Sequence, residues 1–71
     1  MEAQGRLYVP VEHVEVKLRY RSAPVSARVA LSNGGFSLDL EAPAHAVATG
    51  QVAALYEGDA VVGAGVVTRV A

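Results

Sequence analysis

The chain of 71 residues contains no cysteine. Disulfide bonds and cysteine-based metal sites are therefore excluded, and this absence fits a reducing cytoplasm. No apolar run approaches the roughly 18 residues that a membrane-spanning helix needs. The N-terminal residues also lack the charged-then-apolar layout of a secretory signal. We therefore expect a cytoplasmic protein that makes no membrane contact.

Net charge and aromatic side chains are scarce as well. The formal net charge is −1, so no overall field draws the chain to nucleic acid, and any RNA contact must come from a local patch. The only aromatic residues are Tyr8, Tyr20, Phe36 and Tyr56. The hydrophobic content of 52% is mostly valine and alanine, whose small side chains suit a narrow barrel better than a thick helical core. The length allows one small domain.

Strict alternation of apolar and polar residues from Glu12 to Arg21 predicts a half-buried strand. One face is apolar and the other polar: Val14, Val16, Leu18 and Tyr20 against His13, Glu15, Lys17, Arg19 and Arg21. The same alternation predicts strands over 25–32 and 36–41. Between them, Ser32-Asn33-Gly34-Gly35 is a hairpin signal, because asparagine and glycine tolerate positive φ.

The segment Thr49–Val67 is expected to form the hairpin around which the domain is organised. It contains an apolar strand over 51–56, a tight turn at Glu57-Gly58-Asp59, and a second apolar strand over 60–67. Neither strand alternates cleanly, so we expect both faces of each to be covered. The whole pattern predicts an all-β fold, a small antiparallel barrel of five to six strands over residues 12–71. Residues 1–11 are expected to be a linker, a tail or an expression remnant.

Catalytic and metal-binding signals are weak. His13 and His45, with Asp39 or Glu41, are a conceivable metal-ligand set, but zinc-type spacing is missing and two surface histidines are the favoured interpretation. Gly63-Ala64-Gly65 lacks the third glycine of a dinucleotide-binding loop. A carrier domain needs an acceptor lysine at a hairpin tip, whereas the single lysine, Lys17, lies within a strand. We therefore predict no catalytic residue, no metal and no cofactor in this chain.

Basic residues are the stronger signal. Lys17, Arg19 and Arg21 project from one face, about 6.5–7 Å apart along the strand, and Arg28 points outward from the following strand. Cations with this spacing can follow a phosphate backbone, and guanidinium groups bind phosphate with two hydrogen bonds. The alternative is a solvated face in which Glu15 or Asp39 serves as a charge partner.

Two segments carry a family resemblance. The first, over 16–29, contains an alternating strand, the triplet Arg19-Tyr20-Arg21, and Pro24-Val25 before a second strand. The second, over 41–67, contains an acidic-x-Pro start, Gly50-Gln51, Tyr56-x-Gly-Asp and Gly-x-Gly. Together they resemble the C-terminal domain of the bacterial tRNA-specific 2-thiouridylase family, over roughly residues 14–67. The order and the spacing of the motifs both agree.

The resemblance implies a small β-barrel, similar to the second domain of translation elongation factors, that follows a catalytic domain of the ATP-pyrophosphatase type. Such an enzyme uses ATP to activate the wobble uridine of certain tRNAs and then inserts sulfur with catalytic cysteines. The phosphate loop and the cysteines of that machinery are missing from this sequence. A non-catalytic domain that assists tRNA binding or domain orientation is therefore expected.

The resemblance also assigns roles and partners. Arg19, Tyr20 and Arg21 match the family's triplet, and we hypothesise tRNA backbone contact or docking against the catalytic domain for four residues: Lys17, Arg19, Arg21 and Arg28. The resemblance makes six others a structural signature, with turn and packing roles for the glycines: Gly50, Gln51, Gly58, Asp59, Gly63 and Gly65. The expected partners are tRNA and the catalytic domain of the same protein, and the isolated domain is expected to be capable of self-association. Two alternatives stay open: a purely structural or protein-docking barrel without RNA contact, and a ligand-binding barrel with a site near His45.

Overall fold

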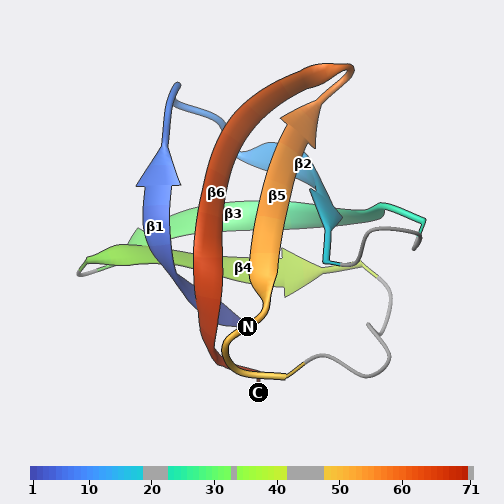
Figure 1. Ribbon diagram of the computed structural model, residues 1–71. Coiled ribbons are helices and arrows are strands. Elements are labelled where there is room, and N and C mark those ends of the chain that lie inside the picture. Colours follow the sequence, from blue (N-terminus) through green and yellow to red (C-terminus); the bar gives the residue numbers. More distant parts are fainter. Residues whose placement is uncertain (19–22, 33, 42–47, 71) are drawn as a thin grey trace.

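The computed structural model describes residues 1–18, 23–32, 34–41 and 48–70. In this part of the chain the elements are all strands: β1 (Glu2–Leu7), β2 (His13–Lys17), β3 (Val25–Ser32), β4 (Gly35–Leu40), β5 (Val52–Glu57) and β6 (Ala60–Arg69). They close into a barrel in the order β1-β4-β3-β2-β5-β6, and β6 pairs back with β1 (Figure 1). Every pair of neighbouring strands is antiparallel. The predicted antiparallel barrel is confirmed. Across the described ranges, no helix is long and apolar enough to cross a membrane.

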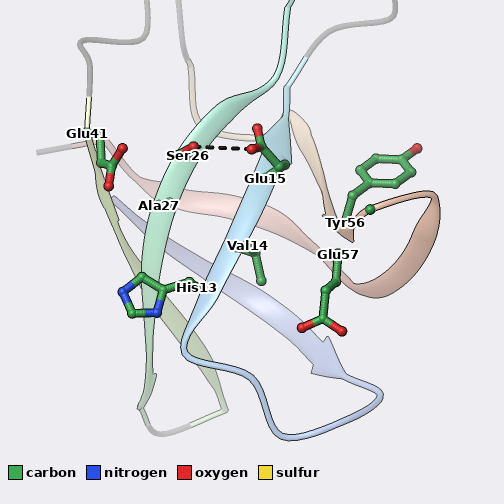
Figure 2. A pocket seen from close by; sticks show the side chains of 9 residues that line it. His13, Val14, Glu15, Ser26, Ala27, Glu41, Tyr56 and Glu57 are labelled. Carbon is green, nitrogen blue, oxygen red and sulfur yellow. Dashed lines mark hydrogen bonds between the residues drawn. The ribbon is translucent and has the colours of Figure 1, made fainter.

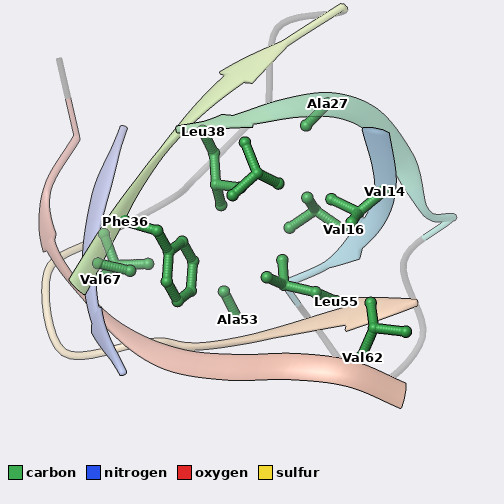
Figure 3. Packing of buried hydrophobic residues seen from close by; sticks show 11 residues of the cluster. Val14, Val16, Ala27, Phe36, Leu38, Ala53, Leu55, Val62 and Val67 are labelled. Atoms are coloured by element: carbon green, nitrogen blue, oxygen red, sulfur yellow. The ribbon is translucent and has the colours of Figure 1, made fainter. Parts of the chain in front are cut away.

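The barrel interior is filled by side chains from all six strands, at alternate positions except in β6, where the register shifts (Figure 3). Phe36 and Leu55 are the largest of the fully buried side chains, and valine and alanine fill most of the remaining space. This matches the composition, because a six-stranded barrel has a narrow interior. The buried cluster consists of Ala3, Val14, Val16, Ala27, Val29, Phe36, Leu38, Ala53, Leu55, Val62 and Val67.

The N-terminal segment differs from the tail expected over residues 1–11. Strand β1 lies between β4 and β6, and its Ala3 is buried with 3% exposure. The period-two pattern of β1 was hard to recognise because Gly5 stands between Ala3 and Leu7, where an apolar side chain is expected. Gly5 lies opposite Gly65 of β6, and a Cβ atom at Gly5 would overlap the Ala64 carbonyl oxygen. The barrel domain therefore includes Glu2–Leu7. A linker role for this segment in a longer protein stays a prediction.

The β3–β4 hairpin extends beyond the barrel (Figure 1). The alternation of β3 puts Leu31 on the same face as Ala27 and Val29, which are buried. Leu31 itself is 78% exposed, although it is paired with Phe36 of β4. Its position near the hairpin tip, past the closed part of the barrel, explains why an inward-facing leucine stays in solvent.

The outer faces of β5 and β6 are also exposed, so the expectation that each face of this hairpin is covered is wrong. Val52, Val61 and Val66 are 61%, 50% and 44% exposed. The inward side chains of the same strands, such as Leu55, are buried. A closed barrel is a single sheet, so burying the inner face of a strand does nothing to cover its outer face.

Three glycines occupy turns in the left-handed region of backbone space. Gly34, Gly50 and Gly58 have φ angles of 74°, 91° and 61°. A Cβ atom at any of these positions would meet no other atom within 4 Å. Glycine is therefore favoured there by backbone conformation alone, since other L-residues rarely adopt this region.

The turn between β5 and β6 offers a direct test of this point. Gly58→Ala is expected to lower the free energy of unfolding by about 1–2 kcal/mol, the cost of a left-handed conformation for an L-residue. Gly58→Asn is expected to cost less, because asparagine visits this region more readily. Urea denaturation of both variants measures the difference. Equal losses for alanine and asparagine would contradict the conformational explanation.

Candidate nucleic-acid or docking interface

Two of the four predicted contact residues lie in the described part of the chain. Lys17 is the last residue of β2, and Arg28 lies on β3, where it pairs with His13 on one side and Asp39 on the other. Both point away from the barrel interior, as the alternation predicted; Arg28 is exposed and Lys17 partly so. The other two, Arg19 and Arg21, lie outside the described residues. The predicted basic stripe is therefore placed at Lys17 and Arg28 only.

A carboxylate lies between these two cations on the outer face. Glu15 projects from β2 at a position between His13 and Lys17, and it accepts a hydrogen bond of 3.2 Å from the Ser26 hydroxyl. It lines an open hollow of about 240 Å³ on the barrel wall. Figure 2 shows the lining side chains: His13, Val14, Glu15, Ser26, Ala27, Glu41, Tyr56 and Glu57. Three carboxylates give this hollow negative charge, which disfavours phosphate at that point.

The conceivable metal-ligand set, which the sequence did not favour, is not assembled among the residues that the structure describes. No three histidine, aspartate or glutamate side chains in the described ranges lie close enough together to hold a metal ion. His13 lines the acidic hollow, whereas His45 lies outside the described residues. The alternative of a ligand site near His45 stays a prediction.

Gly50 and Gln51 shape the entry into β5. The backbone N–H of Gly50 donates to the Val67 carbonyl at 2.8 Å, and the N–H of Val67 donates to the Gln51 carbonyl at 2.8 Å. The Gln51 side chain accepts a hydrogen bond of 2.7 Å from the N–H of Ala48. These bonds tie the turn to β6 near its end, so the structure gives this pair a role in anchoring the turn to the barrel backbone.

The remaining signature residues lie in the β5–β6 hairpin. Gly58 and Asp59 form the turn between the two strands. A Cβ atom at Gly65 would lie 2.8 Å from the Gln4 carbonyl and 3.0 Å from the Phe36 ring. One at Gly63 would lie 2.9 Å from a methyl group of Leu7. Both glycines therefore allow β1 and the core to approach β6 closely.

One exposed cation, Arg6, was not among the contact residues predicted from the sequence. Arg6 lies on the outer face of β1, within the segment expected to be a tail, and pairs with Ala64 of β6. The pattern Gln4, Arg6 outward and Ala3, Leu7 inward is present in the sequence, but Gly5 interrupts it. Recognising a glycine as an inward position would have revealed this strand and its arginine.

A second, more apolar hollow lies where β1 leaves the barrel. It measures about 430 Å³ and is lined by β1 residues, the segment that follows and the β3–β4 hairpin. Tyr8 and Val9 are 57% and 44% exposed beside Leu31. Among the described residues, therefore, the molecule is a small, closed antiparallel β-barrel whose surface carries cations, an acidic hollow and exposed apolar side chains.

Comparison with known proteins identifies this barrel. The profile of the aminomethyltransferase β-barrel domain family matches residues 8–67. The tRNA-specific 2-thiouridylase MnmA of Deinococcus radiodurans is 45% identical over 60 residues, covering 83% of this chain and 16% of the relative. The corresponding enzyme of a Janthinobacterium species is 45% identical over 56 residues, covering 79% and 15%. That of a Synechococcus species is 38% identical over 65 residues, covering 76% and 17%. No solved structure matches the chain.

The chain belongs to the family of β-barrel domains found at the C-terminus of tRNA-specific 2-thiouridylases. The predicted resemblance is confirmed. The chain spans only about a sixth of the length of the curated relatives it matches.

Proposed function

We propose that this chain acts as the non-catalytic C-terminal domain of a tRNA-specific 2-thiouridylase and assists tRNA binding or domain orientation during 2-thiolation of the wobble uridine. The family match over residues 8–67, together with relatives that are named as 2-thiouridylases, carries this proposal. ATP and the sulfur-transferring cysteines would belong to the catalytic domain. The barrel's contribution would be to position the substrate and the other domains.

The RNA contact would come from the basic residues of β2 and β3 and of the sequence that joins them. Lys17 and Arg28 lie on the outside of the barrel, where they are accessible to a phosphate backbone. Arg19 and Arg21 continue the same alternation in the sequence. Guanidinium groups bind phosphate oxygens with paired hydrogen bonds, and each contact formed releases counterions from the RNA.

Titration of tRNA against the 71-residue chain tests this contact. Binding is expected to weaken steeply with salt, because phosphate contacts dominate it. In the variant Arg19→Glu/Arg21→Glu, the slope of log affinity against log salt concentration is expected to fall by about one for each phosphate that the protein no longer neutralises. Arg69→Glu is the matched control, since Arg69 is an exposed arginine at the end of β6 that pairs with Glu2. Unchanged tRNA affinity in the double variant at low salt would reject the RNA contact.

A barrel that docks on protein without touching RNA is the second candidate. Two observations favour it: Glu15 interrupts the cations of the described surface, and the outer faces of β5 and β6 leave valines in solvent. The same titration separates the two functions, because this candidate predicts no salt-dependent binding of tRNA.

A further inference from the structure

The outer face of the β5–β6 hairpin carries three apolar cross-strand pairs in succession. The register pairs Val52 with Val66, Ala54 with Ala64, and Tyr56 with Val61. The valines are exposed, as described above, and the alanines and the tyrosine are partly buried. No other strand of the described chain lies over this face, which looks toward the viewer in Figure 1. We call these six residues the β5–β6 outer face.

A cation lies on each side of the β5–β6 outer face. Arg6 of β1 pairs with Ala64, and Lys17 of β2 pairs with Ala54. Because Ala54 and Ala64 also pair with each other, one row crosses four strands in the order Arg6, Ala64, Ala54, Lys17. Neighbouring strands lie about 4.8 Å apart, so the backbones that carry the two cations are about 14 Å apart along the sheet. The face therefore has an apolar centre with one cation on each side, and Glu15 lies beside Tyr56 on the β2 side.

Charge geometry disfavours a second copy that is centred on the row from Arg6 to Lys17. If two of these faces packed with a two-fold axis across the strands, the Arg6 side chains of the two copies would oppose each other. With the axis along the strands, Arg6 of one copy would oppose Lys17 of the other. Both arrangements, when centred on this row, place like charges together, which costs free energy at an interface.

Chemistry also argues against RNA at this face. Nucleic-acid affinity depends mainly on phosphate contacts from cations, with aromatic rings for stacking on unpaired bases. Here the centre consists of aliphatic side chains plus one tyrosine at the edge. Alanine and valine offer no hydrogen bond to phosphate or ribose. A complementary occupant has apolar side chains at its centre and a carboxylate opposite Arg6, which describes a protein surface.

We propose that the β5–β6 outer face docks against a protein surface with an apolar centre and a carboxylate opposite Arg6, supplied by the rest of a full-length 2-thiouridylase. This inference rests on the proposed function. The relatives are about six times as long as the matched segment, so a large protein surface accompanies this barrel in them. Arg6 sets the orientation of the docked domain, because its carboxylate partner must lie on the β1 side of the face, and Lys17 on the β2 side stays with the RNA contact proposed above.

A chimera tests the docking directly. The C-terminal barrel of the Deinococcus radiodurans enzyme is replaced by this chain, and thermal unfolding of the barrel is followed in the chimera and in the isolated chain. Docking is expected to raise the unfolding temperature of the barrel in the chimera. Val66→Lys is expected to remove this increase and so to lower the unfolding temperature of the barrel in the chimera by about 4 °C or more. The same substitution is expected to leave the unfolding temperature of the isolated chain unchanged, because the side chain is exposed there.

Val70→Lys is the matched control. Val70 and Val66 are both 44% exposed and lie four residues apart, but Val70 follows the end of β6, outside the face. It is expected to leave the unfolding temperature of the chimera unchanged. Equal effects of the two substitutions, or a wild-type barrel that unfolds at the same temperature in the chimera and alone, would overturn the proposal.

A second measurement applies if the chimera is insoluble. The isolated chain is co-expressed with the same relative lacking its own barrel, and co-purification is compared for wild type, Val66→Lys and Val70→Lys. Loss of capture for Val66→Lys alone supports docking, and equal capture of all three rejects it. A dimer of the isolated chain that Val66→Lys dissociates would also reject it in favour of a second copy. These readouts use no tRNA and no thiolation activity, so failure of the proposed function is recognised separately by the salt titration.

Discussion

Deletion of residues 1–7 is expected to abolish the cooperative unfolding transition of this chain. Strand β1 closes the barrel by pairing with β4 on one side and β6 on the other. Its loss opens two strand edges and exposes the core beside Phe36 and Val67. A domain of this length has roughly 4–11 kcal/mol of total stability, which one missing barrel strand is sufficient to exhaust. Circular dichroism against temperature measures the transition.

A point substitution tests the same strand in the intact chain. Ala3→Asp places a carboxylate at a site that is 3% exposed, and it is expected to cost about 3–5 kcal/mol because burial removes the water that hydrates the charge. Ala30→Asp is the matched control on the exposed face of β3 and is expected to cost under about 1 kcal/mol. A sharp, unshifted transition in the deletion variant, with equal effects of the two aspartates, would restore the interpretation of residues 1–7 as a tail.

Leu55→Ala is expected to lower the free energy of unfolding by about 2–5 kcal/mol, the cost of a large-to-small change in a packed core. Leu55 is completely buried and lies between Val16 on β2 and Gly63 on β6. Neighbouring side chains have little freedom to collapse into the space, because the closed ring of strands holds them apart. Urea denaturation with a two-state fit measures the loss.

Leu31→Ala is the matched control for this substitution. Leu31 is 78% exposed at the β3–β4 hairpin, so the same change is expected to alter stability by less than about 0.5 kcal/mol. Leu55→Met keeps the volume and is expected to cost less than about 1.5 kcal/mol. Similar losses for the two alanine variants would show that Leu31 is buried in solution and that the hairpin folds back onto the barrel.

Much of the fold follows from local pattern. The alternation of β2, β3 and β4 predicts that Val14, Val16 and Phe36 face the interior, and each of them is buried. The glycines at 34 and 58 mark two hairpins, and both have the positive φ that such turns require. These features are predictable because side-chain alternation and turn conformation depend on residues that are adjacent in sequence.

The candidate contact surfaces were harder to predict from the sequence than the strands were. The alternation of β2 correctly put Lys17 on the outside, but it carried no information that Arg6 lies level with it on the other side of β5 and β6. The apolar outer face was misread as covered, because a run such as Ala60–Val67 has the same composition whether its second face meets protein or solvent. Family resemblance supplied the domain's identity, which alternation and spacing did not contain.

The sequence by itself determined a small antiparallel barrel, the inward residues of most strands and the family. Only the tertiary structure decided that Glu2–Leu7 complete the barrel, that Leu31 lies past its end, and that Arg6 and Lys17 flank a single apolar face. The physical reason is the range of the interactions involved. Alternation and turns are local, whereas strand register joins residues as distant as Glu2 and Arg69, and register determines which side chains share a surface.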